Sequence, residues 1–200
     1  MKKHSSLWVM LAAVLVLSAC SSSTVERLDP QAQVDLSGEW NDTDAQLVAR
    51  EMVDDALSRA WLPKFVQSNG KDPAVIVGKI KNLSHEHINT AVFIANIERE
   101  LINSGEVQFV ADAQRREEIR NERADQDLNA SEATRKENGQ EYGADFMMQG
   151  QVNTIVDVEG TTQVRFYQVN LELISLKDNR KVWIGDTKIK KLITNSTLRK

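Results

Sequence analysis

The sequence predicts an α/β domain, a mixed sheet of about five strands that ends in an antiparallel meander, with helices mainly on one face. Two observations predict this fold class. Between residues 74 and 110, a β-branched run, a helix-periodic segment and a short apolar run follow one another, which is the order of a strand–helix–strand crossover. From Gly150 onward the chain instead alternates polar and apolar residues, as antiparallel strands with one solvated face do.

The first element is an amphipathic helix that begins near Thr43 and ends before Pro63. Thr43 and Gln46 have the spacing of a capping box. Small and apolar residues then recur with helical period on one side, at Ala45, Val48, Ala49, Met52, Val53, Ala56 and Ala60. Charged and polar side chains occupy the opposite side, so we expect this helix on the surface of the domain.

The crossover follows this helix. Residues 74–80 are rich in Val and Ile without alternation, as in a strand buried on both faces. The next helix is marked by Phe93, Ile94, Ile97 and Leu101, and Gly105 suits its left-handed C-terminal position. A second strand is predicted at residues 107–110, and the connection between the two strands should be right-handed.

A highly charged segment separates the crossover from the meander. Its stretch from Arg115 to Asp127 contains a single aliphatic residue, Ile119, so a helix here can bury only a thin edge. A further irregular helix is expected at residues 131–142, before the chain enters the meander.

The meander consists of three strands separated by two turns. The first strand covers residues 150–158, and Gly160 permits the hairpin turn into the second. Residues 177–180 turn the chain again, and residues 182–189 form the closing strand. The polar positions fall on one side, which we expect to be hydrated: Gln151, Asn153, Gln168, Asn170 and Glu172, with Asp186 and Lys188.

The N-terminus has the pattern of an export signal. Lys2 and Lys3 precede an apolar run at residues 7–17, which is shorter than the roughly 20 residues that a membrane-spanning helix needs. The stretch Leu17–Cys20 resembles the lipobox of bacterial lipoproteins, and Cys20 is the only cysteine of the chain. We therefore expect residues 1–19 to be a signal peptide and Cys20 to be acylated, so that acyl chains hold the protein at a membrane.

The residues after Cys20 predict its destination and its reach. Ser21 rather than Asp follows the cysteine, which resembles the default pattern for the inner leaflet of the outer membrane, facing the periplasm. Residues 20–40 are polar and lack periodicity, so we expect a lipid anchor and a short flexible tether that extends to at most about 70 Å. A single domain then covers residues 41–200.

The sequence offers little chemistry for catalysis. His85, Glu86 and His87 form the one metal-like cluster, but two imidazoles do not make a site, and we interpret them as solvated loop residues. Neither a nucleophile elbow nor a phosphate-binding loop is present. Paired carboxylates for glycoside cleavage stay open as an alternative, although none has an apolar context. We expect a protein that is not an enzyme and has no metal or cofactor.

Composition and charge limit the partners. The chain has 200 residues, of which 41% are hydrophobic and 27% charged, as in a globular protein. Its formal net charge of -4 gives no positive field that would attract nucleic acid, so we expect no nucleic-acid partner.

Six residues are candidate contacts for a protein partner. Three lie in the charged segment, whose charges are balanced; two lie on the hydrated sheet face; and one is aromatic: Arg115, Arg116, Arg120, Gln168, Asn170 and Trp183. The alternatives are a solvent-facing helix with internal ion pairs for the arginines and core packing for the tryptophan.

Several blocks of the chain resemble the LpoB family. They follow the lipobox at residues 35–44, 75–82, 142–146 and 181–185. The resemblance implies a fold similar to the N-terminal domain of TolB and an outer-membrane lipoprotein that is not an enzyme. It also implies a partner, a bifunctional penicillin-binding protein, whose glycosyltransferase and transpeptidase activities members of the family stimulate. We expect the domain to be a monomer.

The tether departs from the family pattern. Relatives carry a long Pro-rich tether that crosses the peptidoglycan, whereas this chain has only Pro30 there. Two other functions therefore stay open. The protein is alternatively a component of an outer-membrane assembly or secretion complex, which should form rings, or a periplasmic hydrolase, which should have a specific pocket.

Overall fold

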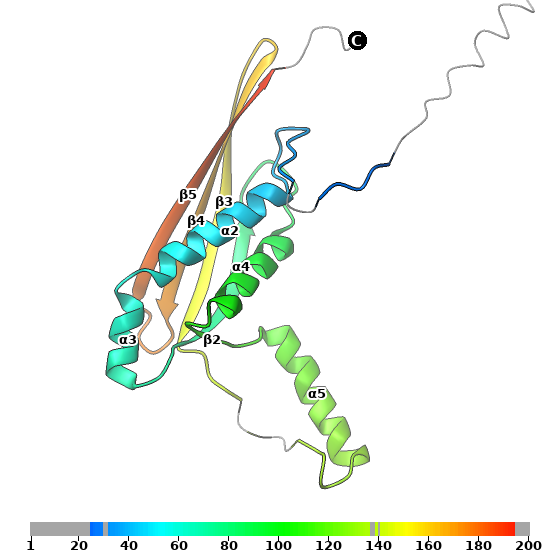
Figure 1. Ribbon diagram of the computed structural model, residues 1–200, viewed down its shortest axis with the longest axis vertical. Helices are drawn as coiled ribbons and strands as arrows, with labels where there is room; N and C mark the ends of the chain where they lie inside the picture. The colour runs from blue at the N-terminus through cyan, green and yellow to red at the C-terminus, as the bar shows by residue number, and fades with distance from the viewer. Residues whose placement is uncertain (1–24, 30–31, 137–138, 140, 195–200) are drawn as a thin grey trace, which may run out of the picture. The chain divides into compact units, whose positions relative to one another are not determined.

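The computed structural model describes residues 25–29, 32–136, 139 and 141–194 (Figure 1). The predicted signal peptide and Cys20 lie outside these residues. Contacts divide the chain into residues 1–32 and residues 33–200, and the second part contains all the helices and strands described below. Among the described residues, no helix is both long and apolar enough to cross a membrane.

A five-stranded mixed sheet forms the domain, in the order β2-β1-β3-β4-β5. Strand β1 (Ala74–Asn82) is an inner strand, second from one edge, and pairs in parallel with β2 (Gln108–Phe109) and with β3 (Phe146–Glu159). Strands β4 (Thr162–Ser175) and β5 (Lys181–Thr194) complete the sheet with antiparallel pairs. The predicted fold class is confirmed, although all three meander strands are longer than the alternation alone indicated.

The N-terminal helical region is two helices and not one. Helix α2 (Asp42–Leu57) begins with a capping box between Asn41 and Asp44, not between Thr43 and Gln46. It ends well before Pro63, and a separate helix, α3 (Trp61–Asn69), contains that proline in its first turn, where its missing N–H costs no intrahelical hydrogen bond. The proline therefore starts a helix here and does not end one.

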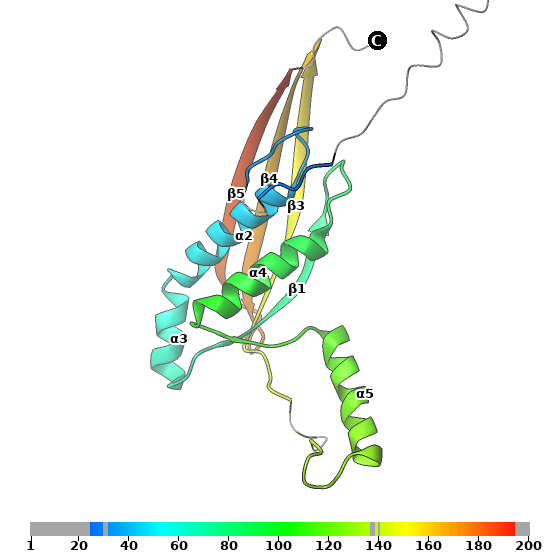
Figure 2. The ribbon, with the colours of Figure 1, turned by 45° about the vertical axis from the view of Figure 1, so that its right-hand side comes forward.

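The hydrophobic core lies between one face of the sheet and two helices. Helices α2 and α4 (Thr90–Ser104) lie side by side over that face (Figure 2). The fully buried side chains of the core come from both the sheet and the helices and include Tyr167, Phe93, Met52, Ile97, Leu101, Met148, Leu171 and Leu173. Gly185 allows the indole of Trp183 to lie across the strand, since a Cβ atom there would meet the ring at 2.3 Å.

The charged segment forms helix α5 (Ala113–Asn129), which contains no buried residue. It stands away from the helices that cover the sheet (Figure 1). The expected irregular helix at residues 131–142 is not present in the described part of that stretch, which consists of turns and extended chain. The described residues of this stretch have little apolar surface that they could bury against the domain.

Candidate functional site

A segment just before α2, which we call the strap (residues 34–41), is fastened to the sheet. Its Trp40 ring packs edge-on against Phe93 of α4 and Tyr167 of β4, at centroid distances of 6.0 and 5.7 Å. The Trp40 amide also donates a hydrogen bond to the Glu86 carboxylate, at 3.2 Å. The strap therefore packs on the folded domain and belongs to the same contact unit, residues 33–200.

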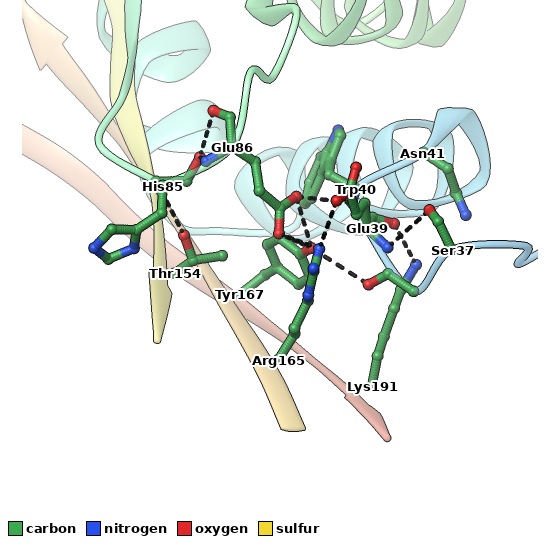
Figure 3. Close-up of polar contacts among 12 residues, drawn as sticks. Ser37, Glu39, Trp40, Asn41, His85, Glu86, Thr154, Arg165, Tyr167 and Lys191 are labelled. Atoms are coloured by element: carbon green, nitrogen blue, oxygen red, sulfur yellow. Dashed lines mark hydrogen bonds and ion pairs between the residues drawn. The ribbon is translucent and has the colours of Figure 1, made fainter. Parts of the chain in front are cut away.

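The carboxylate of Glu86 lies at the centre of the contacts beneath the strap (Figure 3). It accepts hydrogen bonds from the Tyr167 hydroxyl at 2.7 and 2.8 Å and from Nη1 of Arg165 at 2.8 Å. Arg165 also pairs with Glu39 of the strap, at 3.2 Å. The Glu86 and Arg165 side chains are only 13% and 15% exposed. Each charge has therefore lost most of its contact with water, and the ion pair between them compensates for that loss.

Lys191 of β5 makes a second fastening. Its ammonium pairs with Asp35 of the strap at 2.6 Å and with Asp44 of α2 at 2.7 Å, and it donates to the Glu39 carbonyl oxygen at 3.1 Å. Burial lowers the pKa of Lys191, but the hydrogen bonds to Asp35 and Asp44 outweigh burial and raise it. We call Glu86, Arg165, Tyr167 and Lys191, with their strap partners, the clamp.

The clamp is occupied by its own hydrogen bonds, which argues against chemistry. Burial, together with the hydrogen bond to Glu86, raises the pKa of Tyr167 above its ordinary value of 10.0, so its phenol stays protonated. A protonated phenol that donates to a carboxylate is neither a nucleophile nor a base. The carboxylate itself is held by three donor groups. The clamp is therefore a structural joint between the strap and the sheet.

The histidines beside Glu86 point elsewhere. His85 and His87 are exposed, whereas Glu86 between them is turned toward the clamp. The His85 backbone amide donates to the Thr154 hydroxyl at 3.2 Å (Figure 3). Within the described part of the chain, no group of three or more His, Cys, Asp or Glu side chains could hold a metal ion.

The face of the sheet opposite α2 and α4 carries the predicted ladder of amide side chains. Gln151 is the cross-strand partner of Asn170, and Asn153 that of Gln168; all four side chains are half-buried. Of these, Gln151 and Asn170 border a shallow hollow of about 370 Å³ that Lys79 and Lys181 also line. Gln168 and Asn170 thus lie where the sequence placed them, on a polar face that none of the described helices covers.

The three candidate arginines lie on α5 but differ in what they contact. Arg115 pairs with Glu98 of α4 at 2.7 Å, and Arg120 pairs with Glu141. Arg116 lines a cleft of about 490 Å³ beside Phe109 of β2, and its Nε has no hydrogen-bond partner among the described residues. Arg115 therefore fastens α5 to α4, Arg120 joins α5 to the chain that leads into β3, and Arg116 lines the cleft beside β2.

Trp183 does not lie on the surface. Its side chain is 5% exposed, and its Nε1 donates to the Asp55 carboxylate of α2 at 2.8 Å. This indole holds α2 on the sheet, which is the core-packing alternative for a lone tryptophan. We therefore remove Trp183 from the candidate contact surface.

No local sequence pattern predicts that the clamp residues meet. A signal was nevertheless available at Lys191, because counting in twos from Trp183 along the closing strand puts this lysine on the helix-covered face. The partners of Arg165 give no such signal, since Glu86 is 79 residues away in sequence.

The family described as "Peptidoglycan-synthase activator LpoB" matches residues 44–189, which is well over half of the chain and spans the sheet and its covering helices. The chain belongs to the LpoB family. This confirms the resemblance found in the sequence. No curated protein matches the chain.

Solved structures that this LpoB-family chain resembles share little sequence with it. Lipoprotein GNA1162 from Neisseria meningitidis is 15% identical, with a TM-score of 0.41 over 63% of this chain and 88% of that one. The LpoB structure from Escherichia coli, solved by NMR, is 15% identical, with a TM-score of 0.41 over 89% and 84% of the two chains. The LpoB C-terminal domain from Salmonella enterica is 14% identical, with a TM-score of 0.35 over 65% and 93%.

Proposed function

We propose that this protein is a non-enzymatic outer-membrane lipoprotein that binds a bifunctional peptidoglycan synthase, a penicillin-binding protein, and activates it. The observation that carries the proposal is the family match across residues 44–189, which include the sheet, α2, α4 and α5 almost entirely. A clamp whose central Glu86 carboxylate is held by Arg165 and Tyr167 supports a role through contact and not through catalysis. Activation requires that the domain bind the active conformation of the synthase more tightly than the resting one.

Acylation of Cys20 would place this domain at the inner leaflet of the outer membrane. Because the strap is part of the domain, the tether is shorter than the sequence indicated. From Cys20 to Gln33 the chain spans at most about 45 Å when fully extended. The synthase must therefore reach toward the outer membrane to meet this domain. Intact-mass analysis of the native protein tests the anchor: an unmodified Cys20 thiol would exclude it.

Part of the docking surface is proposed to lie on the exposed polar face of the sheet and on α5. Gln168 and Asn170 present amide groups there, and Arg116 presents a guanidinium in the cleft beside β2. Replacing Gln168 and Asn170 together by alanine should weaken binding to the synthase without unfolding the domain, since both side chains lie outside the hydrophobic core. Unchanged affinity would remove this face from the interface.

A polymerisation assay tests the function. A version beginning at Gln33 retains every residue of the hydrophobic core and should therefore fold by itself. We expect it to be retained on immobilised synthase and to increase the rate of glycan-strand synthesis. The absence of a rate change with every bifunctional synthase from the same cell would contradict the proposal. Light scattering should give a monomer; a ring-sized assembly would favour an assembly or secretion component instead.

A further inference from the structure

The end of the sheet opposite the strap contains a groove that neither the clamp nor the proposed docking residues use. Helix α3 and the turn between β4 and β5 border it, and its volume is about 860 Å³. We call it the far groove. Counting along β5 from Lys181 to Lys191, the far groove lies about 34 Å from the clamp.

Aromatic side chains form the floor of the far groove. Phe146 of β3 lies between Trp61 and Phe65 of α3, at centroid distances of 5.1 and 5.3 Å in edge-on contact. Phe65 is half-buried, and Leu176 on the opposite wall is 45% exposed. The groove therefore offers apolar surface that can be buried by the side chain of a partner.

The rim of the far groove is positive. Five cationic and two acidic side chains line it, in a chain whose formal net charge is -4. Arg59, Arg180 and Lys181 already pair with carboxylates of the domain. Lys64 and Lys177 are exposed, and neither has an ion-pair partner among the described residues. Two ammonium groups thus remain available to an incoming negative charge.

The positive surface continues past the groove. Lys181 lines both the far groove and the hollow on the exposed sheet face, where Lys79 and Lys81 add two more positive charges. Charge complementarity therefore favours an acidic occupant, and the aromatic floor favours one that carries a bulky apolar side chain.

We propose that the far groove binds an acidic segment of a protein partner that carries an aromatic or branched aliphatic side chain. Under the function proposed above, on which this assignment of the partner rests, that segment belongs to the synthase. The apolar side chain would lie against Phe65 and Leu176, while carboxylates on either side of it would pair with Lys64 and Lys177.

Charge reversal at two matched places tests the assignment. The groove variant is Lys64→Glu with Lys177→Glu; the control is Arg50→Glu with Arg99→Glu, which makes the same change in net charge at exposed positions of α2 and α4, outside the far groove and the polar sheet face. With full-length protein in detergent, the groove variant should bind the synthase at least about tenfold more weakly and with a shallower salt dependence. The control should stay within about threefold of wild type. Equal losses in both variants would overturn the proposal.

A second readout does not depend on the synthase. On addition of a random copolymer of Glu and Tyr, the amide NMR signals of Phe65, Leu176 and Lys177 should shift, and polyglutamate alone should shift them less. Signals that shift only elsewhere, that do not shift, or that respond to anionic phospholipid vesicles instead would overturn the groove assignment. If the copolymer binds but no synthase does, the groove assignment holds and the proposed function fails. If a synthase binds but the copolymer does not, the proposed function holds and the groove assignment fails.

Discussion

The clamp and the far groove lie at opposite ends of the same long strands, and their charges face different neighbours. At the clamp, Arg165 and Lys191 point into the domain, with side chains 15% and 10% exposed, and carboxylates of the strap, of the loop after β1 and of α2 neutralise them. At the far groove, Lys64 and Lys177 point outward and lack a partner among the described residues. Charges satisfied internally stabilise the fold, whereas unpaired charges beside apolar surface are available for recognition.

The largest effect is expected when the clamp loses its central carboxylate. Glu86→Ala removes the acceptor that Arg165 and the Tyr167 hydroxyl share and leaves Arg165 with Glu39 alone, which should lower the free energy of unfolding by about 3 kcal/mol. Tyr167→Phe, which keeps the ring and removes one hydroxyl, should cost only about 1 kcal/mol. Chemical denaturation measures both. A loss below about 1 kcal/mol for Glu86→Ala would mean that the clamp does not hold the domain together.

The second effect concerns alkaline pH. The pKa values of Tyr167 and Lys191 are both raised in the folded protein, from ordinary values of 10.0 and 10.5. A group with a raised folded pKa stabilises the protein fully below its unfolded pKa, and this contribution disappears as the pH rises through the folded pKa. The denaturation midpoint of wild type should therefore fall above about pH 10.

A double variant checks the origin of that alkaline loss. In Tyr167→Phe combined with Lys191→Met, neither group can titrate, so the midpoint should be lower at neutral pH but change less between about pH 9 and pH 11 than in wild type. Parallel curves for the two proteins would show that the clamp is not responsible.

The smallest effect is expected on α5, which contributes little to the core. Ile119 is 44% exposed, so Ile119→Ser should change the free energy of unfolding by less than about 0.5 kcal/mol. Ile97 of α4 is fully buried, and the matched change Ile97→Ser should cost about 3 kcal/mol or more. Amide hydrogen exchange should also be faster along α5 than along α4. Similar losses for the two variants would show that α5 packs more closely than its exposure indicates.

The local patterns of the sequence predicted much of the fold. Alternation from Gly150 onward predicted the meander and its polar face, because the side chains of a strand point alternately to its two sides. Gly105 ended α4 as predicted, with a left-handed φ of 69°. The break between α2 and α3 was missed, because Pro63 was interpreted as a helix terminator although it lies in a first turn.

The long-range contacts could not be predicted in the same way. The strap lacks periodicity and looked like tether, yet Trp40 packs against Phe93 and Tyr167, which lie far from it in sequence. The far groove likewise combines α3, the start of β3 and the turn between β4 and β5. Such sites arise only when the sheet brings distant segments together, and no local pattern encodes them.

Hydrogen exchange of the full-length protein with and without its synthase tests the contrast between the two ends most directly. The account predicts that synthase slows exchange in α3 and in the turn between Ser175 and Lys181, and leaves exchange at the strap and at the β3–β4 turn unchanged. Slowed exchange confined to the strap or the β3–β4 turn, with α3 unaffected, would contradict it.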